Sequence, residues 1–165
     1  MAPQLLFAYL AQDDPRKSTM KKLERFGMAK KVPLERGSRS VCLTPYSDRF
    51  LLRSDRALIE KVGLFTLDGS WNRIESIKDL KIRNPRKLPL LVPVNPVNFG
   101  KPGKLSSVEA MAGALFITGF EETAKEILSK FNWGLNFLVV NREPLVAYSE
   151  CASQEEVEKT EKEFF

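Results

Sequence analysis

Short apolar runs alternate with turn-forming residues through the first half of the chain. Apolar runs of about four to eight residues, bounded by Gly, Pro, Asp or Ser, are typical of buried strands. The pattern predicts strands at 5–10, 31–34, 40–43 and 64–67. It predicts helices at about 19–26, capped by Ser18 or Thr19, and at 55–61, capped by Ser54, with another helix beginning near Trp71. The basic segment 78–87 is expected to be exposed.

The second half of the chain has the residue spacing of helices. Residues 107–118 are apolar nearly all round, which predicts a buried helix. Further helices are expected at 120–131, at 134–140, at 144–148 beginning with Pro144, and at 154–162 with Ser153 as the cap. We therefore expect an α/β protein in two parts that share a core. Residues 1–92 would form an N-terminal α/β domain with a mixed sheet, and residues 93–165 a mostly helical C-terminal domain.

The stretch 90–112 joins these two parts. Its apolar run at 90–94 predicts a buried strand, and Pro96 and Pro102 stiffen the following loop because each fixes its own φ. Ser106, followed three residues later by Glu109, has the capping-box pattern of a helix start. A strand end followed by a helix N-terminus suits a bound carboxylate or phosphate. A plain proline-rich connection is the alternative interpretation.

The chain contains no histidine and two cysteines, Cys42 and Cys151. The absence of histidine excludes Ser-His-Asp and Cys-His catalysis in their usual forms and argues against a zinc site, so we expect no metal. Two cysteines far apart in the sequence do not make a disulfide framework. The sequence shows no signal peptide and no apolar run long enough to span a membrane, which predicts a soluble, cytoplasmic protein.

Positive charge is concentrated before residue 143. Residues 1–142 contain 24 Lys and Arg against 14 Asp and Glu, whereas residues 143–165 contain 2 Lys and 7 Glu. A basic body with an acidic end indicates an anionic partner, and nucleic acid is the first candidate. A solvated, salt-bridged surface like that of thermophilic proteins is the alternative.

Several short motifs occur in an order that resembles one enzyme family. They are Asp14-Pro15 with Ser18-Thr19, Leu43-Thr44-Pro45, Ser54-Asp55, Leu67-Asp68-Gly69-Ser70-Trp71, Asn95-Pro96-Val97-Asn98-Phe99-Gly100, Lys104-Leu105-Ser106-Ser107-Val108-Glu109-Ala110, Lys130-Phe131-Asn132-Trp133-Gly134, Phe137-Leu138 and Asn141-Arg142. Together they span nearly the whole chain. They resemble the ribosomal RNA aminocarboxypropyltransferases of archaea and eukaryotes, which finish a hypermodified pseudouridine in small-subunit rRNA.

The resemblance implies a SPOUT-like fold in which the C-terminal domain forms a trefoil knot and the cofactor lies at the junction of the two domains. It also implies transfer of the 3-amino-3-carboxypropyl group from S-adenosyl-L-methionine (SAM) to N1-methylpseudouridine, with release of methylthioadenosine. Small-subunit rRNA or a pre-ribosomal particle is then the partner, and a monomer is expected. A SPOUT-type RNA methyltransferase and a non-catalytic pre-rRNA-binding assembly factor are the alternatives.

The resemblance also implies cofactor contacts at specific positions. Thr19 and the backbone of Ser107 would hold the SAM carboxylate, and Trp71 would pack against the methyl group so that the larger group faces the RNA. The backbone of Leu88 and Gly103 would read the adenine edge, and the Leu67 carbonyl would contact the ribose. An apolar slot for adenine would be formed by Leu43, Pro45, Leu88, Leu105 and Ala110. Helix capping at Ser18-Thr19 and core packing of Trp71 are the alternative interpretations of the pattern.

Asp68 is the candidate for the polar catalytic role, beside Trp71. Its carboxylate would accept the proton of the uridine-type ring nitrogen or stabilise the sulfonium. Capping of the following helix is the alternative role for Asp68. Asp55 and Glu109 are expected to be structural, one in the first turn of a helix and the other in a capping box.

Basic side chains in several places are candidates for phosphate contacts, which would make RNA affinity depend on salt. They are Lys17, Lys21, Lys22 and Arg25 on the first helix, Arg49, Arg53 and Arg56 around the second, Lys101 and Lys104 beside the central loop, and Arg142 further on.

Overall fold

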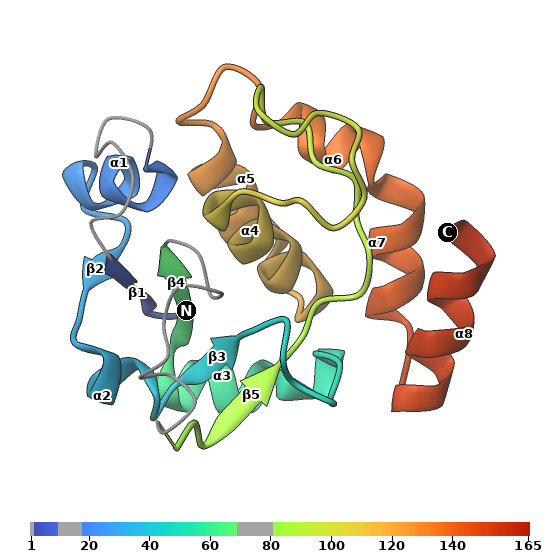
Figure 1. The fold of residues 1–165 in the computed structure, drawn as a ribbon, viewed down its shortest axis with the longest axis horizontal. Coiled ribbons are helices and arrows are strands. Elements are labelled where there is room, and N and C mark those ends of the chain that lie inside the picture. The colour runs from blue at the N-terminus through green and yellow to red at the C-terminus, as the bar shows by residue number, and fades with distance from the viewer. Residues whose placement is uncertain (1, 10–17, 69–80) are drawn as a thin grey trace.

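A computed structural model of the chain describes residues 2–9, 18–68 and 81–165 (Figure 1). Its sheet has the strand order β2-β1-β4-β3-β5. The strands are β1 (Leu5–Tyr9), β2 (Lys30–Lys31), β3 (Val41–Leu43), β4 (Leu64–Asp68) and β5 (Asn84–Arg86). Each neighbouring pair of these strands is parallel, so the expectation of a mixed sheet is wrong. Connections through helices such as α1 and α3 return the chain to the same end of the sheet, which makes its strands parallel.

Helices cover the sheet and make up nearly all regular structure after residue 106. They are α1 (Thr19–Arg25), α2 (Leu34–Gly37), the 3₁₀ turn η2 (Arg53–Asp55), α3 (Arg56–Val62), α4 (Ser107–Ile117), α5 (Glu121–Leu128), α6 (Asn136–Val140), α7 (Arg142–Ser149) and α8 (Gln154–Phe164). Figure 1 shows α4 in the middle of the molecule, between the sheet and the pair α7 and α8. The predicted strands at 5–10, 40–43 and 64–67 and the helices at 107–118 and 154–162 are confirmed within a few residues.

One hydrophobic core runs through both parts of the chain. Its members extend from Leu5 in β1 to Val157 in α8. The central helix α4 is buried along almost its whole length, as its uniformly apolar sequence predicts. Because α4 contacts α1, β4, α5 and α7, it fixes the position of the sheet relative to the C-terminal helices.

The segment expected to be a basic exposed stretch contains the edge strand β5. Arg86 is buried there because its guanidinium forms a salt bridge with Asp55, with Nε–Oδ2 and Nη2–Oδ1 distances of 3.1 and 3.2 Å. The prediction of exposure for 84–86 is therefore wrong, and the structural role predicted for Asp55 is confirmed. The predicted strand at 31–34 is shorter than expected, because Pro33 is the N-cap of the one-turn helix α2.

Residues 90–94 are extended but do not join the sheet, so the strand predicted there is wrong. Side chains of the C-terminal helices bind the backbone in place of a neighbouring strand. Asn141 accepts a hydrogen bond from the Val92 N–H at 2.7 Å and donates one to the Val92 carbonyl at 2.8 Å. Glu161 accepts from the Leu90 N–H at 2.8 Å, and the Tyr148 hydroxyl donates to the Leu90 carbonyl at 2.9 Å. These bonds satisfy polar groups that a sheet would otherwise pair.

Most helix starts follow the predicted capping residues. Ser18 caps α1, Ser153 caps α8, and the capping box of Ser106 and Glu109 is present at α4. Ser54 is not a cap, because the helical turn begins one residue earlier and Asp55 accepts from the Leu52 N–H instead. The helix expected to begin at Pro144 begins at Arg142, since the first helical turn tolerates proline.

Candidate active site

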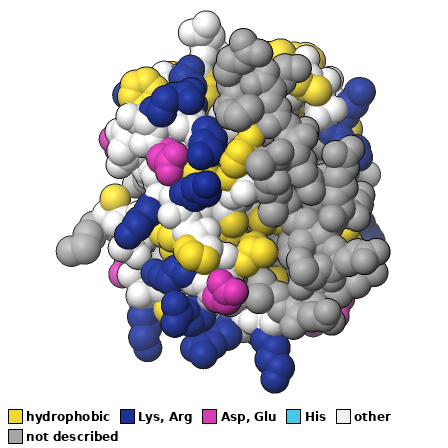
Figure 2. Space-filling view, turned by 60° about the vertical axis from the view of Figure 1, so that its left-hand side comes forward, with side chains coloured by type: hydrophobic (Ala, Val, Ile, Leu, Met, Phe, Trp, Pro, Cys, Tyr) yellow, Lys and Arg dark blue, Asp and Glu magenta, His cyan; other side chains and the backbone are white. Residues whose placement is uncertain are grey.

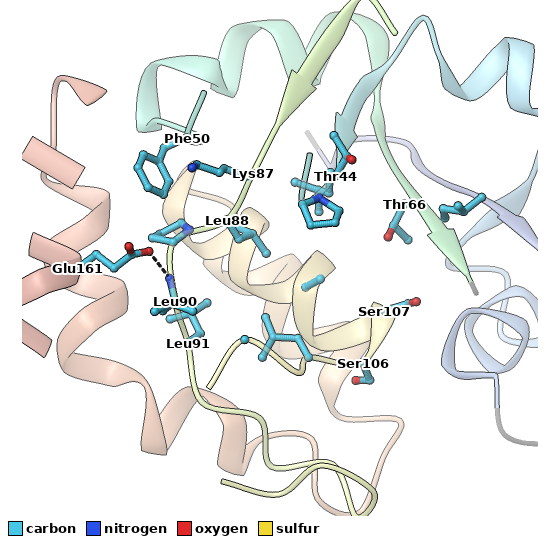
Figure 3. A pocket seen from close by; sticks show the side chains of 17 residues that line it. Thr44, Phe50, Thr66, Lys87, Leu88, Leu90, Leu91, Ser106, Ser107 and Glu161 are labelled. Carbon is cyan, nitrogen blue, oxygen red and sulfur yellow. Dashed lines mark hydrogen bonds between the residues drawn. The ribbon is translucent and has the colours of Figure 1, made fainter. Parts of the chain in front are cut away.

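A cavity of about 530 Å³ opens at the carboxyl ends of β3 and β4, beside the N-terminus of α4 (Figure 3). Its size lies within the usual range for sites that bind small molecules. Carboxyl ends of parallel strands are the common place for ligands in α/β folds. The cavity is lined by Leu43, Thr44, Pro45, Phe50, Thr66, Leu67, Lys87, Leu88, Pro89, Leu90, Leu91, Gly103, Leu105, Ser106, Ser107, Ala110 and Glu161.

This cavity brings together most of the residues predicted to bind the cofactor. The predicted apolar slot, from Leu43 to Ala110, lies entirely in its wall, together with Leu67, Gly103 and Ser107. Thr19 does not line the cavity, and Trp71 lies outside the described residues. Segments that are far apart in the sequence therefore form one apolar surface with polar groups at its edges.

Backbone groups on the cavity wall are available for a ligand. Among the described residues, none forms a hydrogen bond with the backbone N–H or carbonyl of Leu88. Gly103 has a φ of +79°, and its N–H donates to the Leu91 carbonyl at 3.0 Å. That bond holds the loop after Pro102 against the extended segment that contains Leu88. The wall thus presents a fixed donor and acceptor beside an apolar slot, which is the arrangement that recognises a flat heterocycle.

Asp68 ends β4 at the place where the N-termini of α1 and α4 meet. The hydroxyl of Ser18 donates to Asp68 Oδ2, and the hydroxyl of Ser107 donates to Asp68 Oδ1 at 3.0 Å. Thr19 lies beside them, where its hydroxyl accepts from the Val108 N–H at 3.1 Å. Two helix N-termini therefore surround one carboxylate, and the positive ends of their dipoles favour negative charge at this position.

The other end of the cavity is formed by residues that the sequence did not indicate. Figure 3 shows Glu161, Phe50 and Lys87 together at this end, away from Thr66 and Ser107. Lys87 Nζ lies 4.4 Å from the centre of the Phe50 ring. Glu161 belongs to the acidic last helix, and no local pattern distinguishes it from the other glutamates there. Its place in the cavity wall follows only from the position of α8, where Glu161 accepts the hydrogen bond from the Leu90 N–H.

Cys42 and Tyr148 have strongly raised pKa values, and both are unsuited to catalysis. Burial raises the pKa of the Cys42 thiol from 9.0 to about 12, so the thiol stays protonated and unreactive at neutral pH. Burial also raises the pKa of Tyr148 well above its usual range, and the nearby charges of Glu161 and Cys151 act in the same direction. Tyr148 is therefore a hydrogen-bond donor in the fold.

The predicted phosphate-binding side chains differ in their exposure and in their contacts within the fold. Arg25, Arg53, Lys101 and Lys104 are exposed, and Lys22 is half-buried. Arg56 is used within the fold, because it donates to the carbonyl of Gly119 at 2.7 Å and stacks on Phe120. Lys17 lies outside the described residues. Figure 2 shows Lys and Arg side chains along one face, with hydrophobic side chains between them.

Metal-binding clusters and membrane-spanning helices are both absent from residues 2–9, 18–68 and 81–165. No group of three or more Cys, Asp or Glu residues there is arranged to hold a metal ion. None of the helices in these ranges is long and apolar enough to cross a membrane.

Comparisons with known proteins give one consistent result over the whole chain. The model of the family "Ribosome biogenesis protein, C-terminal" matches residues 41–165. The 16S rRNA aminocarboxypropyltransferase of Thermoplasma volcanium is 53% identical over 161 residues, covering 98% of each chain. The enzyme of the same name from Thermoplasma acidophilum is 45% identical with the same coverage. The solved SAM-dependent rRNA:acp-transferase of Vulcanisaeta distributa superimposes with a TM-score of 0.85 at 36% identity, covering 99% of this chain and 96% of that one.

Proposed function

The chain belongs to the family of 16S rRNA aminocarboxypropyltransferases, and from this premise we propose that it transfers the 3-amino-3-carboxypropyl group of SAM to N1-methylpseudouridine in small-subunit rRNA. Methylthioadenosine is the second product. The observation that carries the proposal is the 530 Å³ cavity, whose wall contains the predicted adenine slot and the backbone of Leu88, which no described residue pairs with. Its position at the strand ends, beside a helix N-terminus, supports the same conclusion.

The residues of the cavity fit SAM. Leu43, Pro45, Leu88, Leu105 and Ala110 would enclose the adenine, and the Leu88 and Gly103 backbone would hydrogen-bond to its edge. The N-termini of α1 and α4, with Thr19 and Ser107, would hold the carboxylate, since helix N-termini attract anions. SAM supplies an electrophilic carbon next to a sulfonium. Trp71, outside the described residues, is proposed to cover the methyl group and so to select the larger group by orientation.

Asp68 is proposed to receive the ring N–H of the RNA base. Its two oxygens accept hydrogen bonds from Ser18 and from Ser107, which lines the cavity, so the carboxylate has a fixed direction beside Ser107. A carboxylate can accept more than one hydrogen bond at each oxygen. It can therefore accept the ring proton while the bonds to the two serines hold it in place.

Labelled SAM tests the proposed reaction directly. Purified protein is incubated with rRNA that lacks the modification and with SAM labelled in either the carboxyl or the methyl carbon. Carboxyl label in the RNA, without methyl label, is the expected result. Methyl label in the RNA would instead identify a methyltransferase, and binding of SAM with neither label transferred would support the assembly-factor alternative.

A pair of variants tests whether the cavity is the SAM site. Ala110→Leu places a larger side chain in the cavity wall, and SAM binding by calorimetry should fall at least tenfold. Ala57→Leu is the matched control, because Ala57 is an exposed residue of α3. Equal SAM affinity in both variants would show that SAM does not bind in this cavity.

We also propose the finer architecture that the resemblance implies. Residues 1–92 and 93–165 are taken as two domains with a shared core, the second carrying a SPOUT-like trefoil knot. Supporting this, Asn141, Tyr148 in α7 and Glu161 in α8 bind the backbone of the segment 90–92, which precedes them in the chain by 49 to 71 residues. An experimentally traced chain through 90–165 tests the knot. We further propose that the protein acts as a monomer in the cytoplasm and that its substrate is rRNA or a pre-ribosomal particle.

A further inference from the structure

A basic and aromatic surface lies where the end of α1 meets the turn between α5 and α6. Lys22 of α1 places its Nζ 4.8 Å from the centre of the Phe131 ring, and Lys130 places its Nζ 5.0 Å from the centre of the Phe26 ring. Each of the two segments thus supplies a lysine to a ring of the other. We call Lys22, Phe26, Lys130, Phe131 and Trp133, together with the exposed Arg25 at the end of α1, the lysine–aromatic patch.

The patch is held in a fixed shape. The rings of Phe131 and Trp133 lie 5.1 Å apart at an angle of 37°, and both pack against the hydrophobic core. The turn that carries them is tight, because a Cβ at position 134 would collide with the carbonyl oxygen of Leu128, so Gly134 is required there. Phe26 is different, since 53% of its surface is exposed. An exposed ring on a rigid base is available to stack on a partner.

The cations of the patch are not neutralised within the described residues. Lys22, Arg25 and Lys130 form no salt bridge there, whereas Lys21 pairs with Glu24 at 3.7 Å. A lysine that lies over a ring keeps its full charge for an anionic partner. Unpaired cations beside an exposed aromatic ring match the chemistry of single-stranded nucleic acid, whose phosphates and base faces alternate along the chain.

The patch is also close to the proposed transfer site. The helix α1 begins at Thr19, beside Asp68, and ends at Arg25, next to Phe26. Seven residues of α-helix span about 10 Å, so the two sites lie at opposite ends of one short helix.

We propose that the lysine–aromatic patch binds an unpaired nucleotide of the rRNA near the target nucleotide. Phe26 stacks on its base, and Lys22, Arg25 and Lys130 contact the adjacent phosphates. The identification of the partner as rRNA rests on the proposed function. The patch positions the substrate and takes no part in the chemistry, so its loss weakens RNA binding and leaves SAM binding unchanged.

Two substitutions separate stacking from charge in a binding experiment. The probe is a fluorescent small-subunit rRNA hairpin with N1-methylpseudouridine in its loop, and its dissociation constant is measured at several salt concentrations. Phe26→Ala should weaken binding about tenfold, with an unchanged salt slope, because stacking does not release counterions. Lys130→Gln should weaken binding and lower the slope by roughly 0.7, the value for one phosphate contact on a single strand.

Matched controls come from α8 and its last turn. Phe165→Ala removes a ring that is 43% exposed, and Lys162→Gln removes a lysine that is 75% exposed, so neither should change RNA binding. Phe26→Leu keeps apolar bulk without an aromatic face and should bind as weakly as Phe26→Ala. Wild-type affinity in Phe26→Leu, or in Phe26→Ala, would overturn the stacking role.

The readouts distinguish this inference from the proposed function. If the wild-type protein transfers the label but Phe26→Ala binds RNA equally well, the inference is wrong and the function stands. If no label is transferred but Phe26→Ala and Lys130→Gln still show the predicted binding defects, the function is wrong and the patch stands. A wild-type protein that does not bind the hairpin would overturn the inference.

Discussion

The carboxylate of Glu161 in α8 accepts a hydrogen bond from the backbone N–H of Leu90, 71 residues earlier in the chain, at 2.8 Å. The Tyr148 hydroxyl in α7 donates to the carbonyl of the same residue at 2.9 Å. Both polar groups of Leu90 are therefore held by the C-terminal helices. Leu90 and Glu161 line the same cavity, so the last helix controls the shape of the proposed SAM site without contributing to its adenine slot.

Removal of this contact should weaken SAM binding. Glu161→Ala leaves the Leu90 N–H without its protein partner, and the loss of about 1 kcal/mol corresponds to roughly fivefold weaker SAM binding by calorimetry. Glu161→Gln retains an acceptor oxygen and should lie close to the wild type. Glu158→Ala, an exposed residue of the same helix, serves as the control. Equal effects of Glu158→Ala and Glu161→Ala would show that helix charge matters and the Leu90 contact does not.

The buried carboxylate of Glu109 should be the most sensitive point of the central loop. It accepts from the Val94 N–H at 2.7 Å, from Asn95 Nδ2 at 2.6 Å and from the Ser106 N–H at 2.9 Å, so it joins both ends of the loop. Glu109→Gln places an amide donor against one of these donors and should lower the free energy of unfolding by about 3 kcal/mol, measured in urea.

An exposed glutamate provides the comparison for Glu109. Glu60→Gln removes the charge of an exposed side chain that contacts Arg56, and it should cost less than 1 kcal/mol. A loss in Glu109→Gln no larger than in Glu60→Gln would mean that the loop is held by other contacts.

The buried ion pair of Asp55 and Arg86 should show strong coupling. Arg86→Met leaves the Asp55 carboxylate buried without its cation and should cost about 3 kcal/mol of stability. The double variant Asp55→Asn/Arg86→Met should recover part of this loss, because the uncompensated charge is gone. Arg142→Met breaks an exposed pair with Glu121 and should change stability by less than 1 kcal/mol. Additive effects of the two changes at 55 and 86 would contradict this account.

Stability should fall at alkaline pH because of the Cys42 thiol. Its pKa is raised to about 12 in the folded protein, so the unfolded chain loses the proton first. The contribution is complete below pH 9 and is lost progressively between pH 9 and pH 12, by about 1.4 kcal/mol per pH unit at most. Urea midpoints from pH 8 to 10.5 measure it, and Cys42→Ala should show a shallower decline. Identical slopes in both proteins would exclude the thiol as the cause.

Local patterns predicted the parts of the fold that local physics determines. The caps Ser18, Ser106 and Ser153 were found from short-range hydrogen-bonding preferences, and α4 from its uniformly apolar sequence. The apolar run at 90–94 was misassigned because hydropathy shows burial and extension without showing which groups pair with the backbone. Those partners, Asn141, Tyr148 and Glu161, lie 49 to 71 residues away in the chain.

The residues of the proposed site likewise include some that the sequence predicts and some that it does not. The adenine-slot residues follow from the resemblance, and the structure places all five, from Leu43 to Ala110, around one cavity. Glu161 and Lys87 were not found, because one lies in a glutamate-rich helix and the other in a segment that basic composition placed on the exposed surface. The burial of Arg86 could not be predicted either, since it depends on a carboxylate 31 residues away.

The dependence of the segment 90–92 on Asn141, Tyr148 and Glu161 has a consequence for synthesis of the protein. A ribosome makes these three residues well after every side chain proposed to contact SAM. A chain interrupted before α8 contains all five residues of the proposed adenine slot but lacks the Glu161 contact with the cavity wall at Leu90. We therefore expect the finished chain to bind SAM more tightly than a chain that ends before α8.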